Sequence, residues 1–90
     1  MKIYGVYIQE SWEGGGFRSW WTTKSKARTA SLELVKEEQK KVERSREFDK
    51  GLGGSLNYYD LVESPHQKDQ WIGGCNNWTT ISIDEIEVNE

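Results

Sequence analysis

The residues that could carry out covalent chemistry are few, and they lie together between positions 64 and 77. His66 and Cys75 are the only histidine and the only cysteine of the chain. A thiolate–imidazole pair acts as a nucleophile when the two groups share a hydrogen bond and a third group orients the base. Asp69 is the only candidate for that third group in this segment. The simpler interpretation is a loop histidine and a small, half-buried thiol, so we expect a protein that is not an enzyme.

The same two residues limit metal and redox chemistry. One cysteine cannot form an internal disulfide, and one cysteine with one histidine cannot build a thiolate-based zinc site. The sequence therefore predicts no bound metal and no cofactor. A single thiol suits a reducing compartment, no apolar run approaches the roughly 18 residues of a membrane span, and the N-terminus lacks the long apolar segment of a signal peptide. We expect a cytoplasmic protein.

Three glycine-rich stretches, at residues 14–16, 51–54 and 73–74, are candidates for phosphate cradles. A phosphate loop leads from a strand into a helix N-terminus, where aligned backbone N–H groups meet the anion. Each of these stretches instead runs into or towards an expected strand, and no Gly-Lys-Ser or Gly-Lys-Thr follows. They predict turns and a helix C-cap.

Charge is distributed unevenly along the chain. Residues 24–50 hold nine basic and six acidic residues, and the remainder holds three basic and nine acidic ones. An isoelectric point near 5.2 argues against a broad phosphate-binding face, so direct DNA binding is not expected. Glutamates interleaved with the basic residues of 24–50 predict a solvated helix face. The carboxylates of residues 84–90 predict a solvated strand end, with a nucleic-acid mimic or a cation site as the alternatives.

The strongest signal is an aromatic–arginine group in WEGGGFRSWW, residues 12–21. Trp and Arg are enriched at binding hot spots because they combine a large desolvated area with a polar group. Indole faces also stack on nucleobases. The alternative is that the tryptophans build the core, but a chain of 90 residues does not easily enclose five indoles. The predicted contact set is Trp12, Phe17, Arg18, Trp20, Trp21 and Trp71.

Alternating apolar residues predict strands over residues 2–10 and 17–22, joined by the glycines into a hairpin. No Gly or Pro occurs from Thr22 to Lys50, which predicts one long helix capped by Thr23 or Ser25. Its first half carries an apolar stripe, and its second half is solvated, with Phe48 as an anchor near its end.

Two further strands are expected, over residues 55–63 and 78–88, separated by a long connection over residues 64–77. An apolar parity that switches between Ile83 and Ile86 predicts a bulge or bend near Asp84-Glu85. The fold class is α+β: a single domain over residues 1–90, with an antiparallel sheet of about four strands in the order ββαββ and one long helix packed on one face.

One helix covers only one face of such a sheet, yet three strands are apolar on both parities. Adjacent Trp20 and Trp21 must point to opposite faces, so at most one of them joins the core. An exposed apolar patch of this kind usually marks an interaction surface. Either residues 64–77 cover it, or a homodimer forms through the open sheet face. The side chains expected there are Ile3, Tyr7, one of Trp20 and Trp21, Tyr59 and Leu61, or the alternate set on the other parity of these strands.

Two segments resemble small accessory proteins encoded by phages and prophages. The matching residues open the helix (Thr23, Lys24, Lys26 and Ala27) and form the last strand (Ile83, Asp84, Glu85, Ile86 and Val88). The segment GLGGSLNYYDLVESPHQKDQWIGGCNNW, from Gly51 onward, departs from that compact layout. The resemblance implies a genetic context, in which phage proteins of this size often bind and block a host factor. It assigns no functional residues to this chain.

These observations predict a non-enzymatic, phage-type protein that blocks a host protein or protein complex by stoichiometric binding. An inhibitor of a host defence system, similar in role to an anti-CRISPR protein, fits this description and would act in the host cytoplasm. The alternative is a protein that sequesters a small nucleotide, captured by indoles and glycine N–H groups at a subunit interface.

Overall fold

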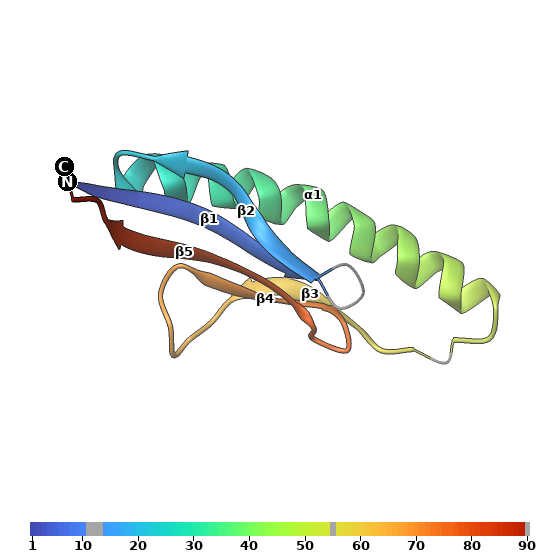
Figure 1. Ribbon diagram of the computed structural model, residues 1–90. Coiled ribbons are helices and arrows are strands. Elements are labelled where there is room, and N and C mark those ends of the chain that lie inside the picture. Colours follow the sequence, from blue (N-terminus) through green and yellow to red (C-terminus); the bar gives the residue numbers. More distant parts are fainter. Residues whose placement is uncertain (11–13, 55, 90) are drawn as a thin grey trace.

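A single helix lies along one face of a five-stranded antiparallel sheet in the computed structural model, which describes residues 1–10, 14–54 and 56–89 (Figure 1). The strand order is β2-β1-β5-β4-β3, and every neighbouring pair is antiparallel. The predicted α+β class is confirmed, but the sheet has one strand more than expected. The elements are β1 (Lys2–Glu10), β2 (Gly14–Trp21), α1 (Lys24–Gly51), β3 (Tyr58–Glu63), β4 (Gln70–Cys75) and β5 (Thr79–Glu87).

The additional strand, β4, lies in the segment that the sequence predicted to be a long connection. Its two glycines suggested a loop, but each has a structural role in the sheet. A Cβ on Gly73 would come within 2.6–2.8 Å of the backbone of β3, so only glycine permits this close approach. Asn76 and Asn77 follow with φ of 55° and 60°, the left-handed pair of a tight hairpin turn into β5.

The helix begins at Thr23, whose Oγ1 accepts a hydrogen bond from the backbone N–H of Lys26 at 3.2 Å. Its buried residues recur every three or four positions, which keeps them on one face: Ala27, Ser31, Leu34, Glu38 and Val42. The C-terminal end of α1 projects past the sheet (Figure 1), and Phe48 there is 72% exposed, so it does not anchor the helix as predicted. Within the described residues, no helix is both long and apolar enough to cross a membrane.

The core lies between α1 and the sheet face that it covers. Strand β1 supplies two core residues, α1 supplies two, and β4 and β5 supply one each: Val6, Ile8, Ala27, Leu34, Trp71 and Ile81. Tyr4, Trp21 and Ile83 pack against its margin. Because Trp71 is only 3% exposed, it is a core residue and leaves the predicted contact set.

The pairing of β1 with β5 runs without a register shift from Lys2–Glu87 to Gln9–Thr80. Of the bulge or bend predicted near Asp84-Glu85, the bulge is therefore wrong. The apolar parity of β5 switches because this central strand supplies side chains to both faces: Ile83 lies on the helix side, and Ile86, opposite Ile3, lies on the other side.

Two isoleucines of β5 test this division of the sheet. Ile81 is fully buried and Ile86 is 37% exposed. We expect Ile81→Ala to lower the free energy of unfolding by about 2–5 kcal/mol, because it leaves a cavity under α1. Ile86→Ala should cost less than about 1 kcal/mol. Urea unfolding of both variants measures the difference, and equal losses would contradict the assignment of the core.

Candidate functional site

A bulge in β2 decides which side chains reach the open face of the sheet, meaning the face opposite α1. Val6 pairs with Ser19 and Tyr7 pairs with Phe17, so Arg18 is an extra residue in β2. Phe17 and Trp20 therefore share the open face. Simple alternation along β2 would have placed them on opposite faces.

Three aromatic side chains, Tyr7, Phe17 and Trp20, meet on the open face and are here called the aromatic cluster. The rings of Tyr7 and Phe17 are edge-to-face, with centroids 5.1 Å apart, and those of Phe17 and Trp20 are tilted at 4.3 Å. Phe17 remains 42% exposed and Trp20 47% exposed. The cluster is thus preorganised by ring contacts while much of its surface faces solvent.

Gly5 supplies the floor of the aromatic cluster. A Cβ at this position would lie 2.7 Å from ring atoms of both Phe17 and Trp20. Gly5 pairs with Trp20 on β2 and with Asp84 on β5, so it is central to the strands that carry the cluster. The missing side chain leaves room for the two rings against the backbone of β1.

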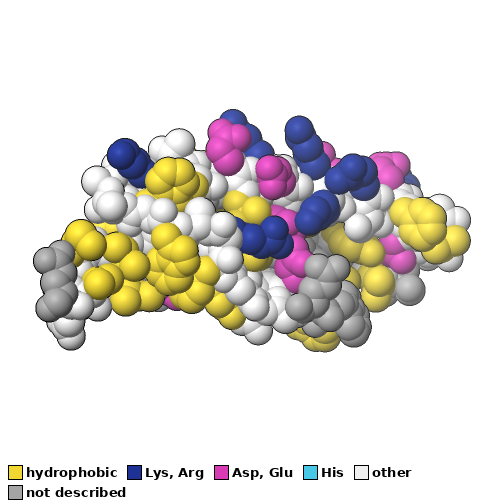
Figure 2. Space-filling view, turned by 45° about the horizontal axis from the view of Figure 1, so that its top comes forward, with side chains coloured by type: hydrophobic (Ala, Val, Ile, Leu, Met, Phe, Trp, Pro, Cys, Tyr) yellow, Lys and Arg dark blue, Asp and Glu magenta, His cyan; other side chains and the backbone are white. Residues whose placement is uncertain are grey.

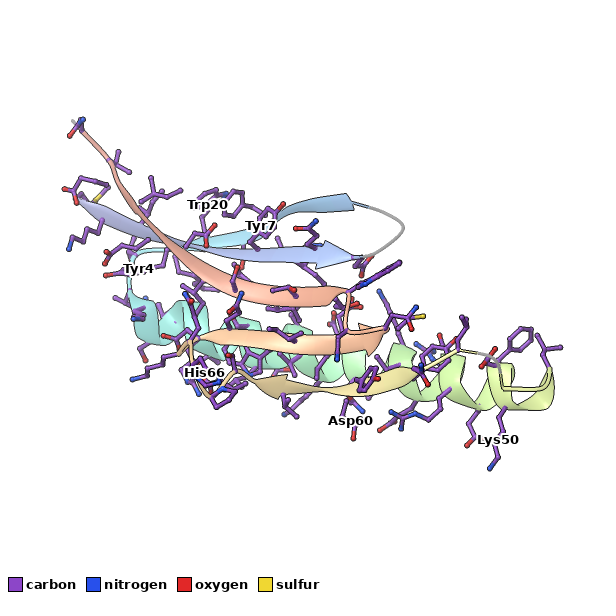
Figure 3. The ribbon with its side chains drawn as sticks, turned by 90° about the horizontal axis from the view of Figure 1, so that it is seen from below. Tyr4, Tyr7, Trp20, Lys50, Asp60 and His66 are labelled. Carbon is purple, nitrogen blue, oxygen red and sulfur yellow. The ribbon has the colours of Figure 1, made fainter. Side chains whose placement is uncertain are left out.

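The rest of the open face is apolar at its margins and polar along β5. Ile3 and Ile86 pair next to the cluster, and Val62, 60% exposed, pairs with Ile72 towards the β3 edge. Figure 3 looks onto this face, with Tyr7 and Trp20 labelled and α1 behind the strands. Among the described residues that strand pairing places here, Asp84 is the only charged one.

The six predicted contact residues do not form one surface. Trp12 lies outside the described residues, and Trp71 is in the core. Trp21 is half-buried on the helix side, where its Nε1 donates to Ser19 Oγ at 2.7 Å. The prediction that Trp20 and Trp21 face opposite sides is confirmed.

Three other residues of the predicted surface lie in different places: Arg18, Leu61 and Tyr59. Arg18 is exposed and lines a hollow of about 180 Å³ with Ile8, Glu10 and glycines 14–16. Leu61 is 8% exposed, and its backbone N–H donates to the side chain of Gln39 on α1, so the alternative that placed Leu61 on the open face is wrong. Tyr59 is 44% exposed and pairs with Gly74.

The most perturbed ionisable groups belong to a structural clamp between α1 and the β3–β4 hairpin. Arg28 donates two hydrogen bonds to the Glu63 carboxylate, at 2.8 and 2.9 Å, and a third to Asp69. Its guanidinium also lies 5.3 Å from the centre of the Trp71 ring. Lys24 reaches Asp69 at 3.3 Å.

The hydrogen bonds within the clamp cause the shifted pKa values of Glu63 and Arg28. The hydrogen bonds from Arg28, followed by that from the backbone N–H of Asp69, lower the pKa of Glu63 to about 2, and the two carboxylates raise the pKa of Arg28. A perturbed pKa often marks an acid–base catalyst. Here each shifted group is held by a partner across the helix–sheet contact, so the shifts reflect a structural role.

The candidate nucleophile pair does not form. His66 is exposed in the turn before β4, and Cys75 is the last residue of that strand. A six-residue strand separates its ends by more than about 15 Å, which is beyond any hydrogen bond. Asp69, the third candidate member, belongs to the clamp. Over residues 1–10, 14–54 and 56–89, no three potential metal-ligating side chains gather at one point.

Comparison with known proteins gives no match to any family model, curated protein or solved structure. Inferences about function therefore rest on the geometry of the open face.

The Arg28–Glu63 contact predicts a specific pH dependence. The pKa of Glu63 is lower in the folded chain than its ordinary 4.5, so its charged form stabilises the fold above that value. This contribution is lost as the pH falls from 4.5 to about 2. We expect the free energy of unfolding of the wild type to fall more steeply over this window than that of Glu63→Gln. Urea unfolding at successive pH values measures it.

Glu33→Gln is the matched control, because Glu33 is exposed and approaches Lys36 at 3.9 Å. It should retain the slope of the wild type. If Glu63→Gln retains that slope as well, the clamp has no role in acid stability.

The floor of the aromatic cluster gives a second prediction. Gly5→Ala places a methyl group against Phe17 and Trp20, and we expect a loss of about 1–3 kcal/mol in unfolding free energy together with a changed near-UV circular dichroism spectrum. Gly16→Ala is the control, since an added Cβ there meets nothing within 4 Å. An unchanged aromatic spectrum in Gly5→Ala would show that the rings do not rest on Gly5.

Proposed function

We propose that this chain is a non-enzymatic binding protein that occupies the surface of a partner protein with the open face of its sheet. The observation that supports this most directly is the aromatic cluster, in which Phe17 and Trp20 stay 42% and 47% exposed although they are fixed by mutual contact. Rigid aromatic side chains bind with little loss of conformational entropy, and they dominate protein–protein hot spots.

The charges of the two faces favour a protein partner over a nucleic acid. Recognition of single-stranded nucleic acid combines stacking aromatics with a basic groove along the phosphates. Nine of the twelve basic residues lie between positions 24 and 50, in α1 on the other side of the sheet. Asp84 is the charged residue that strand pairing brings to the open face. Exposed aromatic side chains with few charges among them are instead typical of the core of a protein interface.

The resemblance of the helix start and the last strand to phage accessory proteins supports a particular setting. In our proposal the partner is a host protein, and binding blocks it by occupation in the host cytoplasm, as an inhibitor of a defence system does. The single cysteine is compatible with that reducing compartment. Sequestration of a nucleotide is the competing function, and the experiment below distinguishes it.

Two matched phenylalanines test the proposed function. The wild-type protein is immobilised, proteins from lysate of cells that express it are identified by mass spectrometry, and the affinity of each purified candidate is measured by calorimetry. We expect Phe17→Ala and Trp20→Ala to weaken binding by about 30-fold or more, corresponding to about 2 kcal/mol. Phe48→Ala, at the exposed end of α1, should stay within about twofold.

Thermal unfolding must show that all three variants are folded. A partner that binds Phe17→Ala and Trp20→Ala as tightly as the wild type contradicts the proposed face. A nucleotide that raises the melting temperature of the wild type in a panel screen would instead support sequestration.

A further inference from the structure

We propose that a second copy of this chain pairs with β2 edge to edge, so that two sheets join across a twofold axis. This inference goes beyond the proposed function, because it concerns the edge of the sheet and holds whether or not the open face binds a partner. It rests on four features: a weakly protected edge, contact surfaces on both sides of that edge, a strand whose two halves are complementary in shape, and charges that match between the two copies.

The edge formed by β2 carries less protection against strand pairing than the opposite edge. Proteins shield edge strands with charges, prolines, bulges or short lengths. β2 has eight residues, no proline and one charged residue, Arg18, which is the extra residue of its bulge. The opposite edge, β3, has six residues, an interrupted register between Tyr59 and Val62, and the carboxylates of Asp60 and Glu63. Pairing with another chain is therefore favoured at β2.

Both sides of the β2 edge offer contacts to an added strand. On the open face lie Phe17 and Trp20. On the helix side a groove of about 560 Å³ runs between β2 and α1, and Figure 2 shows hydrophobic side chains gathered beside the helix in this region. Side chains of a strand alternate between faces, so an added strand would contact both surfaces. The groove is lined by Ser19, Trp21, Ser25, Lys26, Thr29, Ala30 and Glu33.

The occupant that fits this edge is β2 of a second copy. Its first half, residues 14–16, has no side chains, whereas residues 17–21 are bulky. A twofold axis pairs identical strands antiparallel, which places each glycine half opposite the partner's aromatic half. On the helix side of the sheet, an added Cβ at Gly16 meets nothing within 4 Å, so space is open there for a ring of the partner, whereas on the open face the Tyr7 hydroxyl already occupies the position next to Gly15.

Charge complementarity supports the same occupant. Arg18 lies on the helix side of the sheet, where it lines a hollow with Ile8. In a twofold pair, the Arg18 side chain of one copy would approach the groove of the other. Glu33 on the groove wall offers a carboxylate to that guanidinium. The two aromatic clusters would then lie on the same side of one continuous sheet.

Oligomeric state is the first measurement. Sedimentation of the wild type should give a dimer of the 10.5 kDa chain. Ser19→Lys sets like charges against each other along β2, and we expect it to raise the dimer dissociation constant by more than about tenfold. Ser45→Lys, on an exposed position of α1, is the control and should remain dimeric. A wild type that stays monomeric, or a Ser19→Lys variant that dimerises normally, overturns the proposal.

Cross-linking distinguishes the edge from the face. Single cysteines are placed in a Cys75→Ser background, and disulfide formation requires the two Cα atoms to approach within about 7 Å. A scan of Gly16→Cys, Ser19→Cys and Trp21→Cys along β2 should give a covalent dimer at the position nearest the axis. Ser82→Cys, in the middle of the open face, should give none, and a covalent dimer through this residue would show face-to-face association instead.

The two proposals can fail separately. A β2-linked dimer whose aromatic variants bind every candidate partner normally contradicts the proposed function and leaves the dimer intact. A monomer whose Phe17→Ala variant loses its partner contradicts the dimer and leaves the function intact.

Discussion

The contact between one helix and one face of the sheet is the interaction on which the rest of this structure depends. Ala27 and Leu34 of α1 are buried against Val6, Ile8 and Ile81, and that contact forms the apolar core. A domain of this size buries a limited share of its surface, so the contact between one helix and one sheet face accounts for most of its apolar core. The opposite face is left without a cover from the described chain, and its apolar side chains stay at the surface.

The bulge at Arg18 converts this uncovered face into a site. Without the extra residue, Phe17 and Trp20 would lie on opposite sides of β2, and neither would have an aromatic neighbour on its own strand. With it, both rings rest on Gly5 and contact each other 4.3 Å apart. Bulges recur where a side chain must be redirected, and here the redirection concentrates the exposed aromatic area near the β2 edge.

Much of the fold could be predicted from the sequence, because its strongest signals are local. The run without Gly or Pro, together with the apolar stripe of its first half, predicted α1. The apolar residues on both parities of β1 predicted a strand with two apolar faces. β4 could not be predicted, because its glycines are typical of loops and their role depends on the approach of β3, a contact between distant residues. The adjacency of Trp20 and Trp21 predicted that one of them lies outside the core without deciding which, whereas the position of Phe17 depended on a bulge that leaves no clear mark in the sequence.

Oxidative footprinting of the tryptophans tests most directly whether the open face is the binding surface. Trp20 is 47% exposed and Trp71 is 3% exposed, so hydroxyl radicals should modify Trp20 much faster in the free protein. On addition of a purified binding partner, we expect the rate at Trp20 to fall severalfold while the slow rate at Trp71 stays the same. A bound complex in which Trp20 is oxidised as fast as in the free protein would contradict the assignment of the open face as the functional surface.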